Sequence, residues 1–128
     1  YHNFFEAAVL ELYRNRSMWN PGRGDGPKPI TMLSSCQVLQ PISAAAAGGD
    51  VVVGVVAVDL DARSCTFSVG IFAEHGSSIC VEGLLKHSWI NAVSAMEAPT
   101  PRNMPMDVHR ALKAVCKKSE DGEMKLWW

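Results

Sequence analysis

Several features that would assign a function class directly are missing from this sequence. Its longest apolar stretches are strand-like segments and an alanine tract, and none approaches the ~20 apolar residues that a helix needs to cross a bilayer. There is no G-x-S-x-G segment, no P-loop and no G-x-G-x-x-G turn. The sequence therefore gives no motif support for a membrane-spanning helix, a serine hydrolase, a nucleotide hydrolase or a dinucleotide-binding enzyme.

Cysteine is present, but in no pattern that binds metal. The four cysteines lie far apart and include neither a C-x-x-C pair nor a nearby cysteine and histidine cluster. A domain of this length builds an apolar core without disulfides, so we expect reduced thiols in a reducing compartment. We expect no metal and no cofactor.

An excess of charge of one sign is also missing. The chain has 12 Lys and Arg against 13 Asp and Glu, a net charge of -1, which leaves no basic stripe for general nucleic-acid binding. Its 128 residues fit a single domain. A hydrophobic content of 48% against 20% charged residues suits an oligomer or a subunit of a protein complex.

The first fourteen residues have helical periodicity. Apolar side chains recur there at three- and four-residue spacing, at Tyr1, Phe4, Phe5, Ala8 and Leu12. Val9 lies beside this face and Leu10 interrupts the polar arc, so we predict a helix that other elements enclose. The chain opens at Tyr1 without an initiator Met, which we interpret as a removed leader or omitted residues.

Four later segments have the composition of strands: residues 30–39, 51–60, 65–73 and 78–91. The second is almost wholly small or β-branched and apolar, which predicts a strand covered on both faces. The third and fourth alternate with the two-residue period of half-buried strands, and Gly83 marks a bulge or a close approach. Short turns between them predict an antiparallel meander, whereas residues 15–29 and 43–50 are expected to be loops.

The C-terminal part predicts a short helix and a tail. After an extended linker at residues 98–102, Pro105 suits a helix start and Asp107 suits a first turn. The predicted buried face of this helix consists of Val108, Ala111, Leu112 and Val115. We assign residues 1–118 to one domain and residues 119–128 to a tail. The apolar end of that tail, Leu126, Trp127 and Trp128, predicts docking onto a neighbouring protein.

The opening pattern Tyr1-x-x-Phe4-Phe5-Glu6-x-Ala8, followed by four strand-like segments and a proline-led last helix, resembles the hotdog-fold thioesterases of the 4-hydroxybenzoyl-CoA thioesterase type. The resemblance covers roughly residues 1–115 and implies an α+β fold. An antiparallel sheet would wrap around a central N-terminal helix, with a short C-terminal helix added. In that family a loop with the catalytic Asp precedes the position of Tyr1, and this chain does not include that loop.

The resemblance selects Glu6 as the candidate catalytic residue, because it matches a helix acid common in the family. The alternative is that Glu6 only anchors the helix to neighbouring backbone or an Arg. Relatives often have that Arg where Val9 stands, so this departure favours loss of the family's arrangement. His2 lies one turn before Glu6, within reach of a contact. His87 is interpreted as a half-buried strand histidine.

Four further residues are candidates for substrate binding. Ser34 and Ser35, with Gln37, are expected to line a polar pocket beside the helix. Arg63 and Ser64 match the turn of the family near which pantetheine passes.

Two functional hypotheses follow from the resemblance. The first is a non-catalytic or degenerate thioesterase-like subunit, a scaffold or assembly component of a larger, mitochondrial complex. It is motivated by the missing loop, the Ala-Gly tract and Val9. The second is an active acyl-CoA or acyl-carrier-protein thioesterase with a carboxylate just before Tyr1, and a hotdog dehydratase is a weaker third. We expect a homodimer or a complex partner bound through the sheet edge and the tail, in the cytoplasm or the mitochondrial matrix.

Overall fold

The computed structural model describes residues 2–19, 26–40, 52–73, 78–91 and 98–116. Within these ranges the elements follow in the order α1 (His2–Arg16), β1 (Pro27–Val38), β2 (Val52–Leu60), β3 (Ser64–Ala73), β4 (Ser78–Asn91), β5 (Thr100–Pro101) and α3 (Met106–Val115). Neither of these helices has the length and apolar character that crossing a membrane requires.

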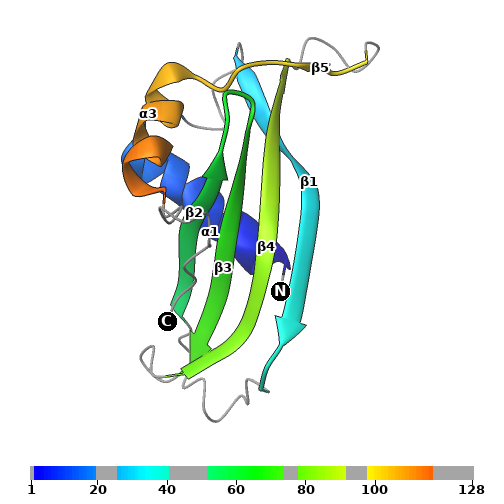
Figure 1. Cartoon of the computed structure of the whole chain (residues 1–128), viewed down its shortest axis with the longest axis vertical. Coiled ribbons are helices and arrows are strands. Elements are labelled where there is room, and N and C mark those ends of the chain that lie inside the picture. The colour runs from blue at the N-terminus through cyan, green and yellow to red at the C-terminus, as the bar shows by residue number, and fades with distance from the viewer. Residues whose placement is uncertain (1, 20–25, 41–51, 74–77, 92–97, 117–128) are drawn as a thin grey trace.

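The strands form one antiparallel sheet in the order β1-β4-β3-β2, and β5 pairs with the end of β4. The predicted meander is confirmed for β2, β3 and β4, which are neighbours in the chain and in the sheet. It is wrong for β1, which lies beside β4 rather than β2. Helix α1 crosses one face of this sheet, and α3 lies beside β2 (Figure 1).

Strand β1 begins at Pro27, earlier than the predicted residue 30. Pro27 and Pro29 favoured a loop because proline lacks the N–H group that a strand ladder uses. Within the described residues β1 pairs only with β4, so it forms an edge of the sheet. An edge strand tolerates proline, since one side of its backbone has no ladder to maintain.

The core lies between α1 and the sheet, on alternate residues of the two central strands. On β3 and β4 the fully buried side chains of this face are Cys65, Phe67, Val69, Ile71, Val81, Leu85, His87 and Trp89. This confirms the two-residue periods predicted for both strands. Burying each large apolar side chain of this set contributes about 1.5–3 kcal/mol to stability.

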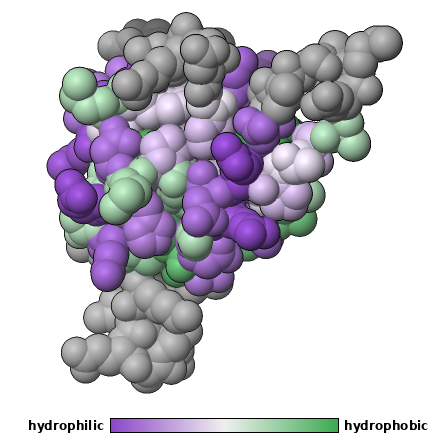
Figure 2. Space-filling view, turned by 90° about the horizontal axis from the view of Figure 1, so that it is seen from above, coloured by the Kyte–Doolittle hydropathy of each residue, from purple (hydrophilic) through white to green (hydrophobic). Residues whose placement is uncertain are grey.

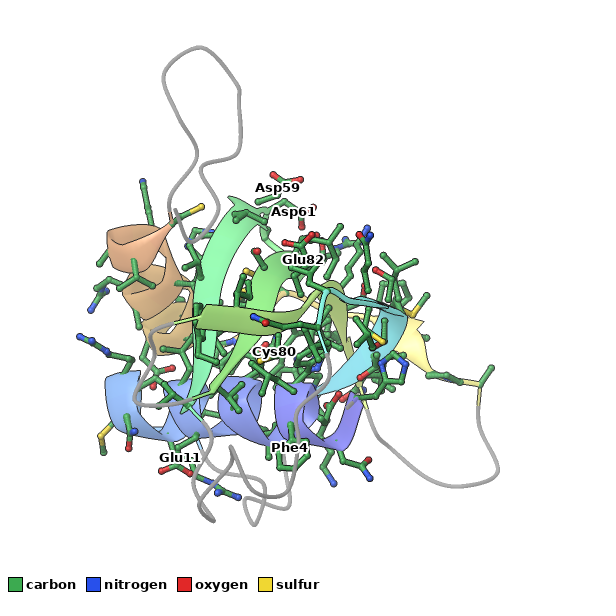
Figure 3. The ribbon with its side chains drawn as sticks, turned by 90° about the horizontal axis from the view of Figure 1, so that it is seen from below. Phe4, Glu11, Asp59, Asp61, Cys80 and Glu82 are labelled. Atoms are coloured by element: carbon green, nitrogen blue, oxygen red, sulfur yellow. The ribbon has the colours of Figure 1, made fainter. Side chains whose placement is uncertain are left out.

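Helix α1 presents a different face to this core from the predicted one. Phe5, Val9 and Tyr13 are buried, whereas Phe4 is 51% exposed. Phe4 and Glu11 lie on the side of α1 that faces away from the sheet (Figure 3). The prediction of an enclosed helix is therefore wrong for this chain. Apolar residues occur on nearly every side of α1, so their spacing could not select the face.

Strand β2 is covered less completely than its composition predicted. Val52 is 50% exposed, while Ala57 and Val58 are buried. Helix α3 contacts β2 and buries Val108 and Leu112. The β-branched composition therefore reflects a strand that is only partly covered by the helices.

Gly83 lets β1 and α1 approach β4 closely, as its position in the strand pattern predicted. A Cβ atom at this residue would lie 2.0 Å from the carbonyl oxygen of Ser35 and 3.0 Å from the ring of Phe5. No side chain fits in that space, because real Cβ contacts are longer. Residue 83 must therefore be glycine, because β4 meets both β1 and α1 there.

Candidate functional site

Polar side chains of α1 meet polar side chains of β1 along one side of the helix. The Thr31 hydroxyl donates to Glu6 Oε2 at 2.6 Å. One turn earlier on the helix, His2 Nδ1 is hydrogen-bonded to the Ser34 hydroxyl. His2 and Glu6 were expected to be within reach of each other, but among the described residues each is paired with a hydroxyl of β1 and no contact joins the two.

Glu6 also contacts a buried histidine of β4. The imidazole of His87 is 0% exposed, and its Nε2 lies 3.0 Å from Glu6 Oε1. On the other side of the ring, His87 Nδ1 lies 2.8 Å from the Tyr13 hydroxyl. We call these four side chains, Tyr13, His87, Glu6 and Thr31, the Glu6 relay. His87 is fully buried, deeper than the half-buried position we predicted.

The environment fixes where the protons of the Glu6 relay lie. Burial lowers the pKa of His87 below its usual 6.5, against an opposing effect of Glu6, so the ring is neutral at pH 7. Burial also raises the pKa of Tyr13 well above its usual value, so that hydroxyl keeps its proton. A carboxylate only accepts, so His87 carries its proton on Nε2 and donates it to Glu6. Nδ1 then accepts from Tyr13, and every polar atom of the ring is satisfied.

The inner end of the relay lies among aromatic rings. The Tyr13 ring packs against Trp19, Phe67 and Trp89 at centroid distances of 5.5 to 6.0 Å. Cys65, which pairs with His87 across the strands, is buried, and this burial raises the pKa of its thiol. The low-dielectric surroundings strengthen the hydrogen bonds of the relay and make them costly to break.

The outer end of the relay is open. The Glu6 side chain is 37% exposed, so solvent or a ligand reaches it while two donors hold its oxygens. A carboxylate held in this way is suited to act as a general base or a nucleophile. Of the predicted candidates, Glu6 is the residue at this open end.

Ser34 and Ser35, predicted together, lie on opposite faces of the sheet. Ser34 faces α1 through its contact with His2. Ser35 and Gln37 line a cavity of about 270 Å³ together with Ser68 and Glu82. Glu82 lies on the sheet face opposite α1 (Figure 3). We call this cavity the outer-face pocket.

Arg63 and Ser64 lie at the turn between β2 and β3. The Asp61 carboxylate accepts from the backbone N–H groups of both residues at 2.8 and 2.9 Å. These bonds, led by that of Arg63, lower the pKa of Asp61. Arg63 also lines a cavity of about 370 Å³ with Arg102 and Asn103. The end of the molecule in Figure 2, where this turn lies, is mainly hydrophilic.

Two further points concern the C-terminal tail and metal binding. Leu126, Trp127 and Trp128 lie outside the described residues. Within residues 2–19, 26–40, 52–73, 78–91 and 98–116, no three His, Cys, Asp or Glu side chains come together as a metal site would require. Cys36 is exposed and Cys65 is buried, and both are free thiols.

Sequence reasoning missed two members of the relay, Tyr13 and Thr31, and the role of His87. One signal was available: His87 shares the buried parity of Leu85 and Trp89 on β4, and a buried histidine needs hydrogen-bond partners. No such signal pointed to Thr31, which is 25 residues from Glu6 in the chain.

No protein-family model matches the chain, and no curated protein matches it either. Solved structures resemble it. The PA5185 protein from Pseudomonas aeruginosa is 22% identical, with a TM-score of 0.78 over 91% of this chain and 76% of that one. The dynemicin thioesterase is 16% identical, with a TM-score of 0.74 over 91% of this chain and 81% of that one. The SAV2348 protein from Staphylococcus aureus, in complex with CoA, is 12% identical, with a TM-score of 0.72 over 100% of this chain and 74% of that one.

At these identities the likeness establishes the fold. It confirms the predicted α+β architecture, but it does not distinguish the 4-hydroxybenzoyl-CoA type from other thioesterases of this fold. The antiparallel sheet with α1 across one face and the short α3 beside it is the hotdog fold found in thioesterases.

Proposed function

We propose that this chain hydrolyses acyl thioesters and that Glu6 supplies the carboxylate. The observation that carries the proposal is the state of that side chain: two donors, Thr31 and buried His87, hold its oxygens, and it stays 37% exposed.

In the proposed reaction Glu6 acts as a general base. It takes a proton from water as the water oxygen bonds to the thioester carbonyl carbon, giving a tetrahedral intermediate. The carbon–sulfur bond then breaks, and the proton passes from Glu6 to the leaving sulfur. The products are a carboxylic acid and a thiol. In the proposed reaction the positive end of the dipole of α1, at its first turn, favours negative charge on the former carbonyl oxygen.

The proposed substrate is an acyl group on a pantetheine carrier, either CoA or an acyl carrier protein. The support comes from structural neighbours, one named as a thioesterase and another solved with CoA. Arg63 and Ser64 are proposed to contact the carrier, and Ser34 to contact the substrate near Glu6. The place of Ser35 on the other face makes it the weaker of the two serine candidates.

The test is thiol release from a panel of acyl-CoAs by the purified chain and by Glu6→Gln. Glutamine keeps the shape but cannot take the proton, so we expect kcat to fall by about 100- to 10,000-fold. His109→Gln, a change on α3 away from the relay, is the matched control and should keep full activity. Equal turnover by the wild type and Glu6→Gln would contradict the role of Glu6.

A second candidate function is a non-catalytic scaffold, and one observation favours it. Large apolar side chains are exposed on β1, its C-terminal flank and α1: Phe4, Met32, Leu33, Val38 and Leu39. β1 is also an edge strand of the described sheet, so a second copy or another protein is proposed to bind there. A wild type that is assembled in solution but releases no thiol from any substrate would favour this function over hydrolysis.

A further inference from the structure

We propose that Tyr13 and His87 are positioning residues that orient the Glu6 carboxylate through a one-way hydrogen-bond chain running from Tyr13 to His87 to Glu6. The inference rests on the proposed thioester hydrolysis. It assigns a task to two core residues that would otherwise count only as packing.

The first support is geometric. The two ring nitrogens of His87 contact two different residues of α1, at 2.8 Å to Tyr13 and 3.0 Å to Glu6. Tyr13 lies two helical turns after Glu6, so one face of the helix holds both ends of the imidazole. Rotation of the ring would break both bonds together.

The second support is the complete burial of the link. His87 is 0% exposed and Tyr13 is 1% exposed, so water cannot reach the hydrogen bond between them. The titratable groups that face the ring are Glu6 and Tyr13 from α1 and Cys65 from the adjacent strand β3. Burial raises the pKa of Tyr13 and of Cys65, so both of these groups keep their protons at pH 7.

The third support is the direction of donation. Tyr13 has a single proton, and giving it to Nδ1 leaves Nε2 as the protonated nitrogen that faces Glu6. In the opposite tautomer a lone pair on Nε2 would face the carboxylate. Tyr13 and the Glu6 carboxylate therefore favour the same tautomer, and Thr31 fixes the second carboxylate oxygen.

The first experiment needs no activity. A long-range proton–nitrogen NMR spectrum of isotope-labelled protein should show His87 protonated on Nε2 at pH 7, with its signals identified by their loss in His87→Gln. Tyr13→Phe removes the donor to Nδ1 and should shift the Nδ1 signal, while the proton stays on Nε2 because the Glu6 carboxylate still accepts it. A wild-type ring protonated on Nδ1, or an unchanged Nδ1 signal in Tyr13→Phe, overturns the one-way chain.

The second experiment compares two replacements of the same ring. Phenylalanine fills its volume without hydrogen bonds, and glutamine keeps an acceptor and a donor. For His87→Phe we expect kcat to fall by about 10- to 100-fold with KM changed less than about twofold, and for His87→Gln we expect kcat within about fivefold of the wild type. Tyr13→Phe should lie between them. Circular dichroism of each variant checks that it is folded.

The outcomes separate this inference from the proposed function. If the wild type and both His87 variants release thiol equally well, hydrolysis stands and the positioning role is overturned. If kcat falls equally in His87→Phe and His87→Gln, or if KM alone changes, packing explains the effect and the positioning role is again overturned. If the wild type releases no thiol from any acyl-CoA or acylated carrier protein, the proposed function fails and the catalytic task falls with it, while the NMR result still tests the direction of the chain.

Discussion

Polar side chains on the two faces of the β1–β4 ladder differ in their hydrogen bonding. On the face toward α1, Thr31 and His87 each bond to Glu6. On the other face, Glu82 Oε2 is buried in the outer-face pocket with no hydrogen-bond partner among the described residues. The same two strands supply both sets. For Thr31 and His87, the partner comes from a second layer, α1, that covers their face of the ladder.

The largest effect is expected from a change that disturbs both faces together. In Gly83→Ala the new Cβ atom would meet the Ser35 carbonyl oxygen at 2.0 Å, so β1 must move away from β4. We expect the free energy of unfolding to fall by about 3 kcal/mol or more. Urea denaturation followed by circular dichroism measures it.

The matched control is Gly26→Ala, since nothing lies within 4 Å of a Cβ atom there. It should change stability by no more than about 0.5 kcal/mol. Equal stability of the two variants would show that β1 and β4 are not held together as described.

A smaller effect should distinguish the two faces. Thr31→Val removes the donor to Glu6 Oε2 while keeping the β-branched shape, and should cost about 1 kcal/mol and lower kcat severalfold. Ser35→Ala, on the outer face, should change stability by less than about 0.5 kcal/mol and leave kcat unchanged. A larger loss of activity in Ser35→Ala than in Thr31→Val would move the site to the outer-face pocket.

The smallest effect is a pH dependence confined to the helix-facing side. The pKa of His87 is lowered by burial, so below its usual pKa of 6.5 the unfolded chain binds a proton that the folded chain does not. The free energy of unfolding should therefore fall as pH decreases below 6.5, by at most about 1.4 kcal/mol per pH unit. Above pH 6.5 the protonation of His87 should contribute no pH dependence. In His87→Gln this part of the slope should vanish. Denaturation curves at a series of pH values measure it, and identical slopes in both proteins would contradict a neutral buried His87.

The elements with a clear period were predictable from the sequence. β4 runs over residues 78–91, as its alternation predicted, and Gly83 lies at a close approach. The buried face of α1 was not predictable, because Phe4 and Phe5 are equally apolar and only packing against the sheet exposes one and buries the other. The position of β1 was not predictable either, since a strand next to β4 in space is distant from it in the chain.

The residues of the candidate site also include some that the sequence predicted and others that only the structure identified. Glu6 came from the opening residues and their resemblance to a family, and Ser34 came from the polar residues of its strand. Their partners came only from the structure, since His87 is 81 residues from Glu6 and 74 from Tyr13.

By itself the sequence determined the element types and the alternating core of β3 and β4, because periodicity and composition act over short stretches of chain. The hotdog architecture was implied by the resemblance of its opening residues to a family. The tertiary structure alone decided which helix face is buried, where β1 pairs and which groups hold Glu6. Those outcomes depend on contacts between residues far apart in the chain. The hydrogen-bond partners of a buried histidine are the groups that the fold places at the right distance and direction from its ring nitrogens.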